Sequence, residues 1–465
     1  MKSRKSKIHS RVHAIPEIRF EEGQEMTPYA GAVLIQALFQ KLEFKEKLRE
    51  CFRHIGGQSI FGCPAVVLLL VVHLMLGFRK LRGLDYYQED PMISRIIGVR
   101  HLPGVSTVSR TSERIDFQGV VNLQSLCRRM VLDRVSTECC PRVTIDFDGS
   151  VLSTKRHAEA SAVGYNKIKK GARSYYPLFC TVSQTGQFLD VYHRSGNVHD
   201  SRGAMLFMRS CILAVKKRLP KAIIEVRIDG AFFSERLLKQ LDRLGVIFSA
   251  SVPFERLSEL KELVEKRTHW DVVDKIWSTF EAKWKPASWT SSFRFVVSRQ
   301  RVKKQDKSPV QLDLFKPRSS DSNNEFEYDY RVIVTNHAAQ CLSVMRFHHG
   351  RGCQERIFSE AKSMAQLDYI PFNKLIPNQV FTLSAMLAHN LTRELQMQAK
   401  ERECGTTQKR NTLWSFETLS TLRQNLFHRA GIFKRPQGKL TLVLNSNAAV
   451  EREFKIYLDA LQSAA

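Results

Sequence analysis

The sequence predicts an α/β (α+β) protein, in which a mixed sheet with helices occupies the middle of the chain and helical regions lie on both sides of it. Three observations predict this class. Apolar residues recur with helical spacing from Tyr29 to about Val135. Short β-branched runs typical of strands begin after Pro141 and return until Thr335. Helical spacing then resumes from about Gly352 and continues to the C-terminus.

The composition indicates a folded and strongly basic protein. A chain of 465 residues is long enough for several domains with hydrophobic cores. Lys and Arg number 72 against 46 Asp and Glu, which gives a net charge of +26. This excess favours a polyanionic partner, because each phosphate neutralised by a basic side chain releases condensed counterions. A ribosome-associated or merely basic protein would have the same composition, so charge alone leaves both alternatives open.

Zinc binding, export and a membrane partner are not expected. The ten cysteines show neither C-x-x-C spacing nor paired Cys/His clusters. The N-terminal MKSRKSKIHSR is a basic tail without the apolar stretch that export requires, so we expect a cytoplasmic protein with reduced thiols. The apolar run Ala65–Phe78 is shorter than the roughly twenty residues of a membrane span. We expect it to form a buried helix that Pro64 begins.

The first part of the chain is expected to be an arm followed by a helical domain. Residues 1–25 are predicted to form a flexible basic arm, and residues 26–136 a helical DNA-binding domain. Within His101–Arg114, a Pro-Gly turn and the cap candidate Ser106 precede a helix. That helix exposes three side chains suited to DNA, namely Thr107, Arg110 and Arg114. The pattern fits a recognition helix, although a plain bundle helix fits it nearly as well.

The strand-rich middle has a specific order of elements. A short strand, Arg142–Phe147, is followed by two strand runs, Tyr176–Ser183 and Phe188–Arg194, that a Gly-containing turn joins into a hairpin. A helix at Ser201–Arg218 and a buried strand at Ala222–Ile228 come next. Strand, hairpin, helix and strand is the order of a ribonuclease-H-like core, and we assign its first part to residues 137–248.

Residues 249–328 interrupt this pattern and are predicted to form a β-rich insertion. They contain a cluster of tryptophans, an alternating strand at Phe293–Val297, a basic run and a polar linker. The alternating stretch Phe326–Thr335 returns the chain to the sheet. We therefore assign residues 329–400 to the second part of the core and residues 401–465 to a helical C-terminal region.

Two acidic residues end predicted strands of the core. Asp148 follows the strand of TIDFDGS and precedes Gly-Ser, where the strand turns. Asp146 lies two residues earlier on the same strand face, so it is an alternative to Asp148. Asp229 follows the apolar strand AIIEVRI, a position where open α/β sheets place active sites. Each acid alone is also explained as a residue that caps a turn or a helix.

A third acid is selected by helical geometry. His348, Arg351, Glu355 and Lys362 fall within an arc of about 60° on one helix face, because each residue turns a helix by about 100°. Glu360 falls outside that arc, while Ile357, Ala361 and Met364 form an apolar stripe on the opposite side. A solvated charged face would show mixed charges all round the helix, which the apolar stripe contradicts.

Three carboxylates from separate elements predict a site for divalent metal ions. Phosphodiester transfer requires a deprotonated nucleophile and a stabilised leaving oxygen, and two Mg²⁺ ions about 4 Å apart supply both. The predicted metal ligands, and the catalytic residues, are Asp148, Asp229 and Glu355, with Asp146 as the alternative first ligand.

These residues resemble the catalytic triad of DDE transposases of bacterial insertion sequences, in the branch with a ribonuclease-H-like core, an inserted β domain and a Tyr-Arg-Glu-Lys signature. The helix from His348 to Lys362 matches that signature except for His348, which stands where the family has Tyr. The segments GRGCQERIFSEAK, GYNKIKKGARSYYPL and RSGNVHDSRGA look like members of the same branch. The likeness covers roughly residues 140–400.

The resemblance implies a function, a cofactor and partners. It implies a cut-and-paste transposase of the bacterial cytoplasm and nucleoid that binds terminal inverted repeats, cleaves DNA and transfers 3′-hydroxyl ends into target DNA. It implies two Mg²⁺ ions, with Mn²⁺ as an alternative, and a homodimer on paired double-stranded DNA ends. A nuclease or resolvase without strand transfer, and a DNA-binding relative whose catalysis is unused, are the alternatives. The implied contacts to DNA phosphates are His348, Arg351, Lys362, Lys167, Lys169, Lys170 and Arg173.

Overall fold

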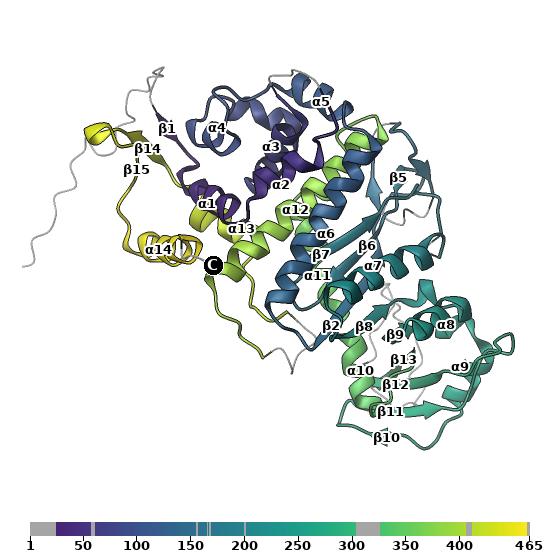
Figure 1. Ribbon diagram of the computed structural model, residues 1–465. Helices are drawn as coiled ribbons and strands as arrows, with labels where there is room; N and C mark the ends of the chain where they lie inside the picture. Colours follow the sequence, from purple (N-terminus) through teal and green to yellow (C-terminus); the bar gives the residue numbers. More distant parts are fainter. Residues whose placement is uncertain are drawn as a thin grey trace, which may run out of the picture.

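The computed structural model describes residues 25–56, 61–154, 157–164, 166, 169–199, 201–303, 326–405 and 412–462. Figure 1 shows the N-terminal helices and the C-terminal elements together on one side of a long sheet, with strands β10–β13 at the far end of that sheet. The predicted mixed class, with a large mixed sheet and helices at both ends, is confirmed.

The N-terminal region is helical, as predicted. Helix α3 is apolar on all sides, has a proline in its first turn and is buried along most of its length, so it is a core helix. Asp90 begins α4 by accepting hydrogen bonds from the backbone N–H groups of Met92 and Ile93, both at 2.9 Å. The elements are η2 (Ala30–Ala32), α1 (Val33–Lys41), α2 (Phe44–Cys51), α3 (Cys63–Met75), η3 (Leu81–Tyr86), α4 (Pro91–Ile97), α5 (Val105–Glu113) and α6 (Phe117–Thr137).

The core of the protein is a nine-stranded sheet with the order β10-β11-β12-β13-β9-β8-β2-β6-β7. Its central strands β2, β8 and β9 are parallel, and β6 and β7 form the predicted antiparallel hairpin beside β2. The core strands are β2 (Arg142–Gly149), β6 (Leu178–Val182), β7 (Gln187–Tyr192), β8 (Ile223–Ile228) and β9 (Ile247–Ser251). Helix α7 (Ala204–Arg218) connects the hairpin to β8, and α8 (Glu235–Arg243) connects β8 to β9.

The strands of the predicted insertion continue this sheet instead of forming a separate one. Strand β13 pairs antiparallel with β9, so it covers the edge of the parallel core that would otherwise be open. The added strands are β10 (Asp271–Val272), β11 (Trp277–Ala282), β12 (Arg294–Lys303) and β13 (Phe326–Thr335), preceded by η5 (Phe254–Arg256) and α9 (Ser258–Glu265). A pairing between residues about eighty positions apart is not visible in a local sequence pattern.

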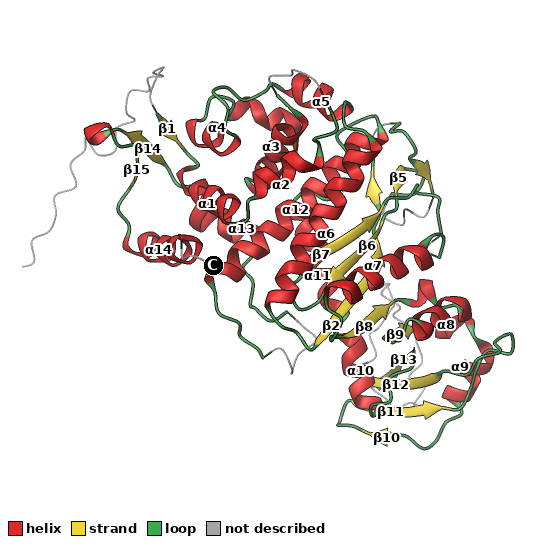
Figure 2. Cartoon of the chain, viewed as in Figure 1, coloured by secondary structure: helices red, strands yellow, loops and turns green. Residues whose placement is uncertain are grey.

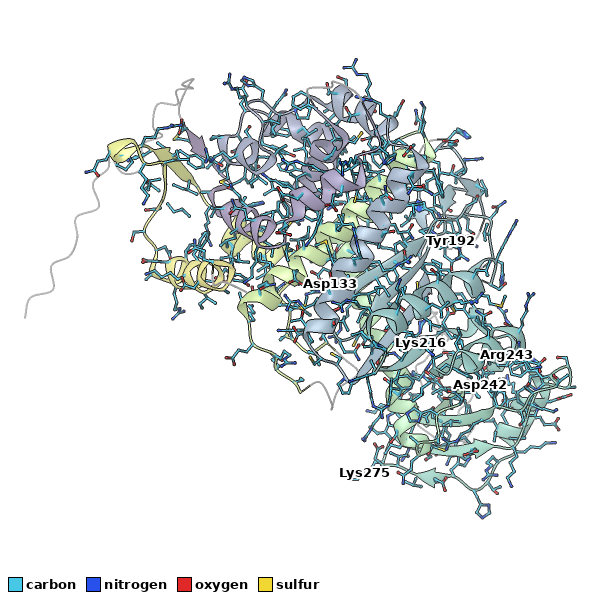
Figure 3. All side chains as sticks on the ribbon, in the orientation of Figure 1. Asp133, Tyr192, Lys216, Asp242, Arg243 and Lys275 are labelled. Carbon is cyan, nitrogen blue, oxygen red and sulfur yellow. The ribbon has the colours of Figure 1, made fainter. Side chains whose placement is uncertain are left out.

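Helices cover both faces of the core strands (Figure 2). Helices α7 and α8 pack on one face, where Arg218 donates to Asp133 of α6 at 3.0 Å and Lys216 donates to the backbone oxygen of Leu244. Asp133, Lys216 and Asp242 are labelled in Figure 3. The other face carries α10 (Cys341–His349), α11 (Gly352–Met364) and α12 (Leu375–Ala399), and the last of these is buried over most of its length.

The C-terminal region contains helices and also a β-hairpin that the sequence did not predict. Strand β1 (Met26–Thr27) pairs with β14 of this hairpin, so the beginning of the described chain is joined to the C-terminal region. A turn with positive φ at Gln437 and Gly438 closes the hairpin. The elements after α12 are α13 (Leu419–Leu422), η6 (Arg423–Phe427), β14 (Gly431–Lys434), η7 (Pro436–Gly438), β15 (Thr441–Leu444) and α14 (Ala448–Gln462).

Candidate active site

The two faces of strand β2 differ in chemistry. Val143, Ile145 and Phe147 are fully buried and join the apolar cluster under α7 and α8. The alternate residues, which include Asp146 and Asp148, point to the opposite face. Strands β8 and β9 follow the same rule, because Glu225, Arg227, Ser249 and Ser251 alternate with apolar core residues. The sheet therefore presents a polar face to α10 and α11.

The parallel register of β2 and β8 brings the first two acids together. Asp146 lies beside Arg227, and Phe147 lies beside Ile228. One further step of this register places Asp148 beside Asp229, at the carboxyl ends of both strands. Asp229 also begins the short helix η4 (Gly230–Phe232), since its carboxylate accepts a hydrogen bond from the backbone N–H of Ala231 at 3.1 Å.

Arg351 bridges the two aspartates. Its Nη1 lies 3.7 Å from a carboxylate oxygen of Asp148, and its Nη2 lies 3.9 Å from one of Asp229. All three side chains are mostly buried, with between 17% and 31% of each side chain exposed. A cationic group thus stands where two adjacent carboxylates create a local excess of negative charge.

The predicted helix of the third acid is divided in two. Helix α10 ends at His349 and α11 begins at Gly352, although Gly350 and Arg351 between them keep helical φ and ψ. Glu355 lies one turn beyond Arg351 and is exposed. Glu360, the rejected competitor, instead pairs with Arg393 of α12 and accepts from the backbone N–H of Leu419. Glu360 therefore links α11 to α12 and to the segment that begins at Leu419.

Lys362 lies on α11 close enough to the site for its charge to interact with Asp148. Burial lowers the pKa of Lys362, and the nearby carboxylates of Asp368 and Asp148 oppose that shift. A partly desolvated ammonium group beside the aspartate pair is suited to bind an anionic ligand such as a phosphate.

The acidic side chains of this site have the ligand chemistry that magnesium requires, but they are not gathered around one point. Asp148, Asp229 and Glu355 offer the hard carboxylate oxygens that Mg²⁺ prefers. However, no group of three His, Cys, Asp or Glu side chains in the described part of the chain is close enough to hold one ion together. The guanidinium of Arg351, a cation within 4.0 Å of two of the acids, occupies this space instead.

Asp146 is removed from the list of metal ligands. Both of its carboxylate oxygens accept hydrogen bonds from Arg227, at 2.6 and 2.7 Å, and both side chains are almost fully buried. A buried carboxylate whose two oxygens both accept from an arginine is already paired inside the protein. Asp148 is therefore the better first ligand, and the sequence could not separate them because both occupy one strand face.

The expected DNA contact of His348 is also corrected. Its Nδ1 lies 2.9 Å from the hydroxyl of Ser249 and its Nε2 lies 2.8 Å from that of Ser251. Burial lowers the pKa of His348 to about 3, assisted by the positive charges of Arg351 and Arg227. A neutral ring with both nitrogens engaged anchors α10 to β9 and offers no charge to a phosphate.

The basic loop after Asp148 is partly described. Lys169 and Lys170 are exposed, whereas Lys167 lies outside the described residues. Arg173 donates to the hydroxyl of Ser161 at 3.1 Å and to its backbone oxygen, so its guanidinium is already engaged within the small sheet β3-β5-β4. That sheet consists of β3 (Leu152–Ser153), β4 (Ala162–Val163) and β5 (Arg173–Tyr175).

Two adjoining clefts open beside the acids. One, of about 530 Å³, is lined by Arg351 and Glu355 together with Arg331 of β13, and the other, of about 610 Å³, by Gly230 beside Asp229 and by Arg256. Val252, Phe254 and Tyr330 line both clefts. The sequence reasoning missed Arg256 and Arg331, and no local motif marks either residue.

The aromatic residues of the added strands have structural roles. Trp289 packs against Phe233 and Phe293, and Trp284 packs edge-on to Phe295. Both tryptophans contribute to the apolar cluster of the sheet.

Helix α5 (Val105–Glu113) forms in the predicted segment, but the cap prediction was wrong: the N-cap is Gly104, and Ser106 lies inside the first turn. Val108 and Thr111 are buried, while Arg110 is exposed and Arg114 donates to the backbone oxygen of Gly56 at 3.2 Å. An exposed arginine on a short helix suits a DNA groove, but a surface helix of a bundle has the same features. DNA reading by α5 stays a prediction.

Adjacent aspartates at the carboxyl ends of parallel strands, with basic side chains around them, form a polar site at the edge of the sheet where α/β proteins commonly place active sites. The chain matches the family described as Transposase DDE domain group 1 over residues 16–465 and therefore belongs to that family. The resemblance to DDE transposases is thus confirmed. No curated protein shows significant sequence similarity to the chain.

One solved structure similar to the chain is a piggyBac transposase in a synaptic complex with hairpin DNA, determined by cryo-EM. The two chains share 11% sequence identity with a TM-score of 0.39, over 86% of this chain and 79% of the other. Among the described helices, none combines the length and the hydropathy required to cross a bilayer.

Proposed function

We propose that this member of the family is a cut-and-paste DNA transposase that binds the terminal inverted repeats of its element, cleaves DNA there and joins the 3′-hydroxyl ends to target DNA. The observation that carries the proposal is the convergence of Asp148, Asp229 and Arg351, with Glu355 one helical turn beyond Arg351 and lining one cleft with it. This arrangement combines hard anionic ligands with cations suited to phosphates.

In this proposal Asp148, Asp229 and Glu355 hold two Mg²⁺ ions, or Mn²⁺ in their place. When bound, such ions activate an attacking oxygen and stabilise charge on the leaving oxygen. The chain positions the acids: the ends of β2 and β8 hold the aspartates rigidly, and the first turn of α11 supplies the glutamate. Arg351 must release at least one aspartate for the ions to enter, and it is then free to bind a phosphate bidentately.

The remaining basic residues are proposed to bind the DNA backbone. Lys362 would contact a phosphate near the scissile bond as a point charge. Lys169 and Lys170 would bind phosphates further along the duplex, which gives affinity without sequence reading. Two copies of the chain are proposed to act together on paired ends, since joining two ends to one target requires two active sites.

A strand-transfer assay tests this function. Purified protein is mixed with Mg²⁺, a labelled candidate end and a plasmid, and the labelled plasmid product is measured. We expect joined product from the wild type and none from Asp148→Ala, Asp229→Ala or Glu355→Ala, while all four bind the end in a gel-shift assay. The matched controls Asp459→Ala and Glu259→Ala, which change exposed acids on α14 and α9, should retain full activity.

The assay also separates the alternatives. Cleaved ends without joined product would indicate a nuclease or resolvase. Binding of ends without Mg²⁺-dependent cleavage would indicate a relative that no longer uses its catalytic site. Cleavage at wild-type rate by each of the three alanine variants would refute the assignment of the acids.

A further inference from the structure

Arg227 is a fully buried arginine at the centre of the polar face of the sheet. Its Nε and Nη2 donate to the two carboxylate oxygens of Asp146, at 2.6 and 2.7 Å. Nη2 also donates to the hydroxyl of Ser183 at 3.0 Å, and Nη1 donates to the backbone oxygen of Phe347 at 3.1 Å. One side chain of β8 is thus bonded to β2, to the end of β6 and to the last turn of α10.

The junction between α10 and α11 lies directly against this arginine. A Cβ atom added at Gly350 would lie 2.2 Å from Nη1 of Arg227, closer than real Cβ contacts. Gly350 has helical φ and ψ, so an added side chain is opposed by the close approach and not by the backbone conformation, and either Arg227 or the junction would have to shift. The glycine is what allows the junction to approach the sheet so closely.

Two further contacts hold the same junction. The side-chain amide of Gln354 donates to the backbone oxygen of Asp146 at 3.1 Å, and Gln354 is itself almost fully buried. His348 is held between the hydroxyls of Ser249 and Ser251. The residues on either side of Arg351 and Glu355 are therefore fixed to three neighbouring strands.

We propose that Arg227, clamped by Asp146, is a positioning residue that sets the distance of Glu355 from the Asp148–Asp229 pair. The inference rests on the proposed function, because it assumes that these three acids form one metal site. The connection between this pair and the acids is short. Asp229 is the next residue after Arg227 on the same face of β8, and Asp148 is the next residue after Asp146 on the same face of β2. The junction that Arg227 contacts leads, about one helical turn later, to Glu355.

A purely structural ion pair is the competing explanation, and it makes different predictions. A buried pair of this kind stabilises the fold only when both partners are present. If Arg227 serves the fold alone, weakening its contacts should lower the melting temperature and leave the metal affinity of the folded protein unchanged. If it positions Glu355, metal affinity should fall even where the melting temperature is preserved.

Gly350→Ala is the most informative variant. Alanine stabilises helical backbone better than glycine, whereas its Cβ atom pushes the junction away from Arg227. Gly352→Ala is its matched control: it lies in the same junction, and a Cβ atom there meets nothing within 4 Å. Mn²⁺ binding to the DNA-free protein is measured by electron paramagnetic resonance at a temperature where circular dichroism shows each variant folded. We expect Gly350→Ala to weaken Mn²⁺ binding about tenfold and Gly352→Ala to leave it unchanged.

A double-variant cycle gives a second, independent readout. If Gly350 and Arg227 act through Glu355, then Gly350→Ala should have little further effect on Mn²⁺ binding in a Glu355→Ala background. Arg227→Lys keeps the charge but cannot reach Asp146 and Phe347 together, so we expect the same pattern from it. Equal Mn²⁺ affinity of Gly350→Ala and Gly352→Ala, or full additivity with Glu355→Ala, would overturn the inference.

The result is also distinguishable from failure of the proposed function. If Asp148→Ala and Asp229→Ala leave both Mn²⁺ binding and cleavage unchanged, the metal site itself is misplaced and the inference falls with it. If these variants abolish binding while Gly350→Ala and Arg227→Lys do not weaken it, the metal site stands and only the positioning role of Arg227 is refuted.

Discussion

Removing Arg351 should strengthen metal binding, although the residue lies inside the proposed site. Its guanidinium is 3.7 Å from Asp148 and 3.9 Å from Asp229, so it competes with any cation for both carboxylates. Two unit charges about 4 Å apart attract by about 1 kcal/mol in bulk water and by about 4 kcal/mol at an effective dielectric constant of about 20. Even the lower value, applied to both pairs, gives about 2 kcal/mol.

That energy converts into a measurable shift in affinity. Since about 1.4 kcal/mol corresponds to a tenfold change in an equilibrium constant, Arg351→Ala should bind Mn²⁺ about 30-fold more tightly than the wild type in the absence of DNA. Cleavage of DNA ends should nevertheless fall, because the phosphate loses its bidentate partner. The increase should shrink as ionic strength is raised, since salt screens partly exposed charges.

The control for this experiment is Arg356→Ala, which removes the same charge from an exposed position on the same helix. Mn²⁺ titrations followed by electron paramagnetic resonance compare the two variants at equal net charge. If Arg351→Ala binds Mn²⁺ no more tightly than Arg356→Ala, the guanidinium does not compete with metal. The competitive relation between Arg351 and the ions would then be refuted.

Other consequences can be checked separately. Burial lowers the pKa of His348 to about 3, so the unfolded chain takes up this proton first as the pH falls below about 6.5. The stability contributed by the neutral His348 ring is therefore complete above that pH and is lost as the pH falls. In urea titrations, His348→Gln should reduce the pH dependence of the free energy of unfolding between pH 6.5 and 4 by about 1.4 kcal/mol per pH unit. An unchanged slope would contradict the buried neutral ring. Lys362→Ala should weaken end binding and lower the salt dependence of that binding by about one phosphate contact. Its Mn²⁺ affinity should be equal or slightly higher, because the charge of Lys362 also acts on Asp148, and a loss of Mn²⁺ affinity would argue against a phosphate role. Lys169→Ala with Lys170→Ala should weaken binding to specific and unrelated duplexes equally in gel shifts, whereas a selective loss on the specific end would indicate sequence reading.

Local patterns were sufficient to predict much of the core. The alternation in RVTIDF and the apolar strand before Asp229 predicted both strands, and the hairpin between them was visible from its turn. Because parallel strands end at one edge of a sheet, the nearness of Asp148 and Asp229 was also predictable. Helical spacing selected Glu355 over Glu360, and the structure gives Glu360 a separate partner.

What the sequence did not predict depends on partners far apart in the chain. Asp146 and Asp148 lie on the same face of one strand, so the alternation of the sequence cannot distinguish them. The ion pair with Arg227, 81 residues later in the chain, is what distinguishes Asp146. His348 has the spacing of a site residue, but its surroundings are set by Ser249 and Ser251 on β9. The addition of β13 to the edge of β9 is likewise a long-range pairing that no local signal marks.

A polar face on a buried sheet is costly unless every group on it is paired, since buried charges without partners destabilise a fold strongly. In this protein Arg227 satisfies the requirement in the interior. It donates hydrogen bonds to Asp146 and to the end of α10, beneath the junction between α10 and α11. The same face ends one residue pair later in Asp148 and Asp229, whose carboxylate oxygens lie 3.7 and 3.9 Å from the guanidinium of Arg351. Along the two strands, a close ion pair in the interior is thus followed by a longer contact between carboxylates and Arg351, where in the proposed function a metal ion or a phosphate would compete with an internal partner. In the proposed role, the buried pair of Asp146 and Arg227 fixes the geometry of the acids that follow it at the ends of the same strands.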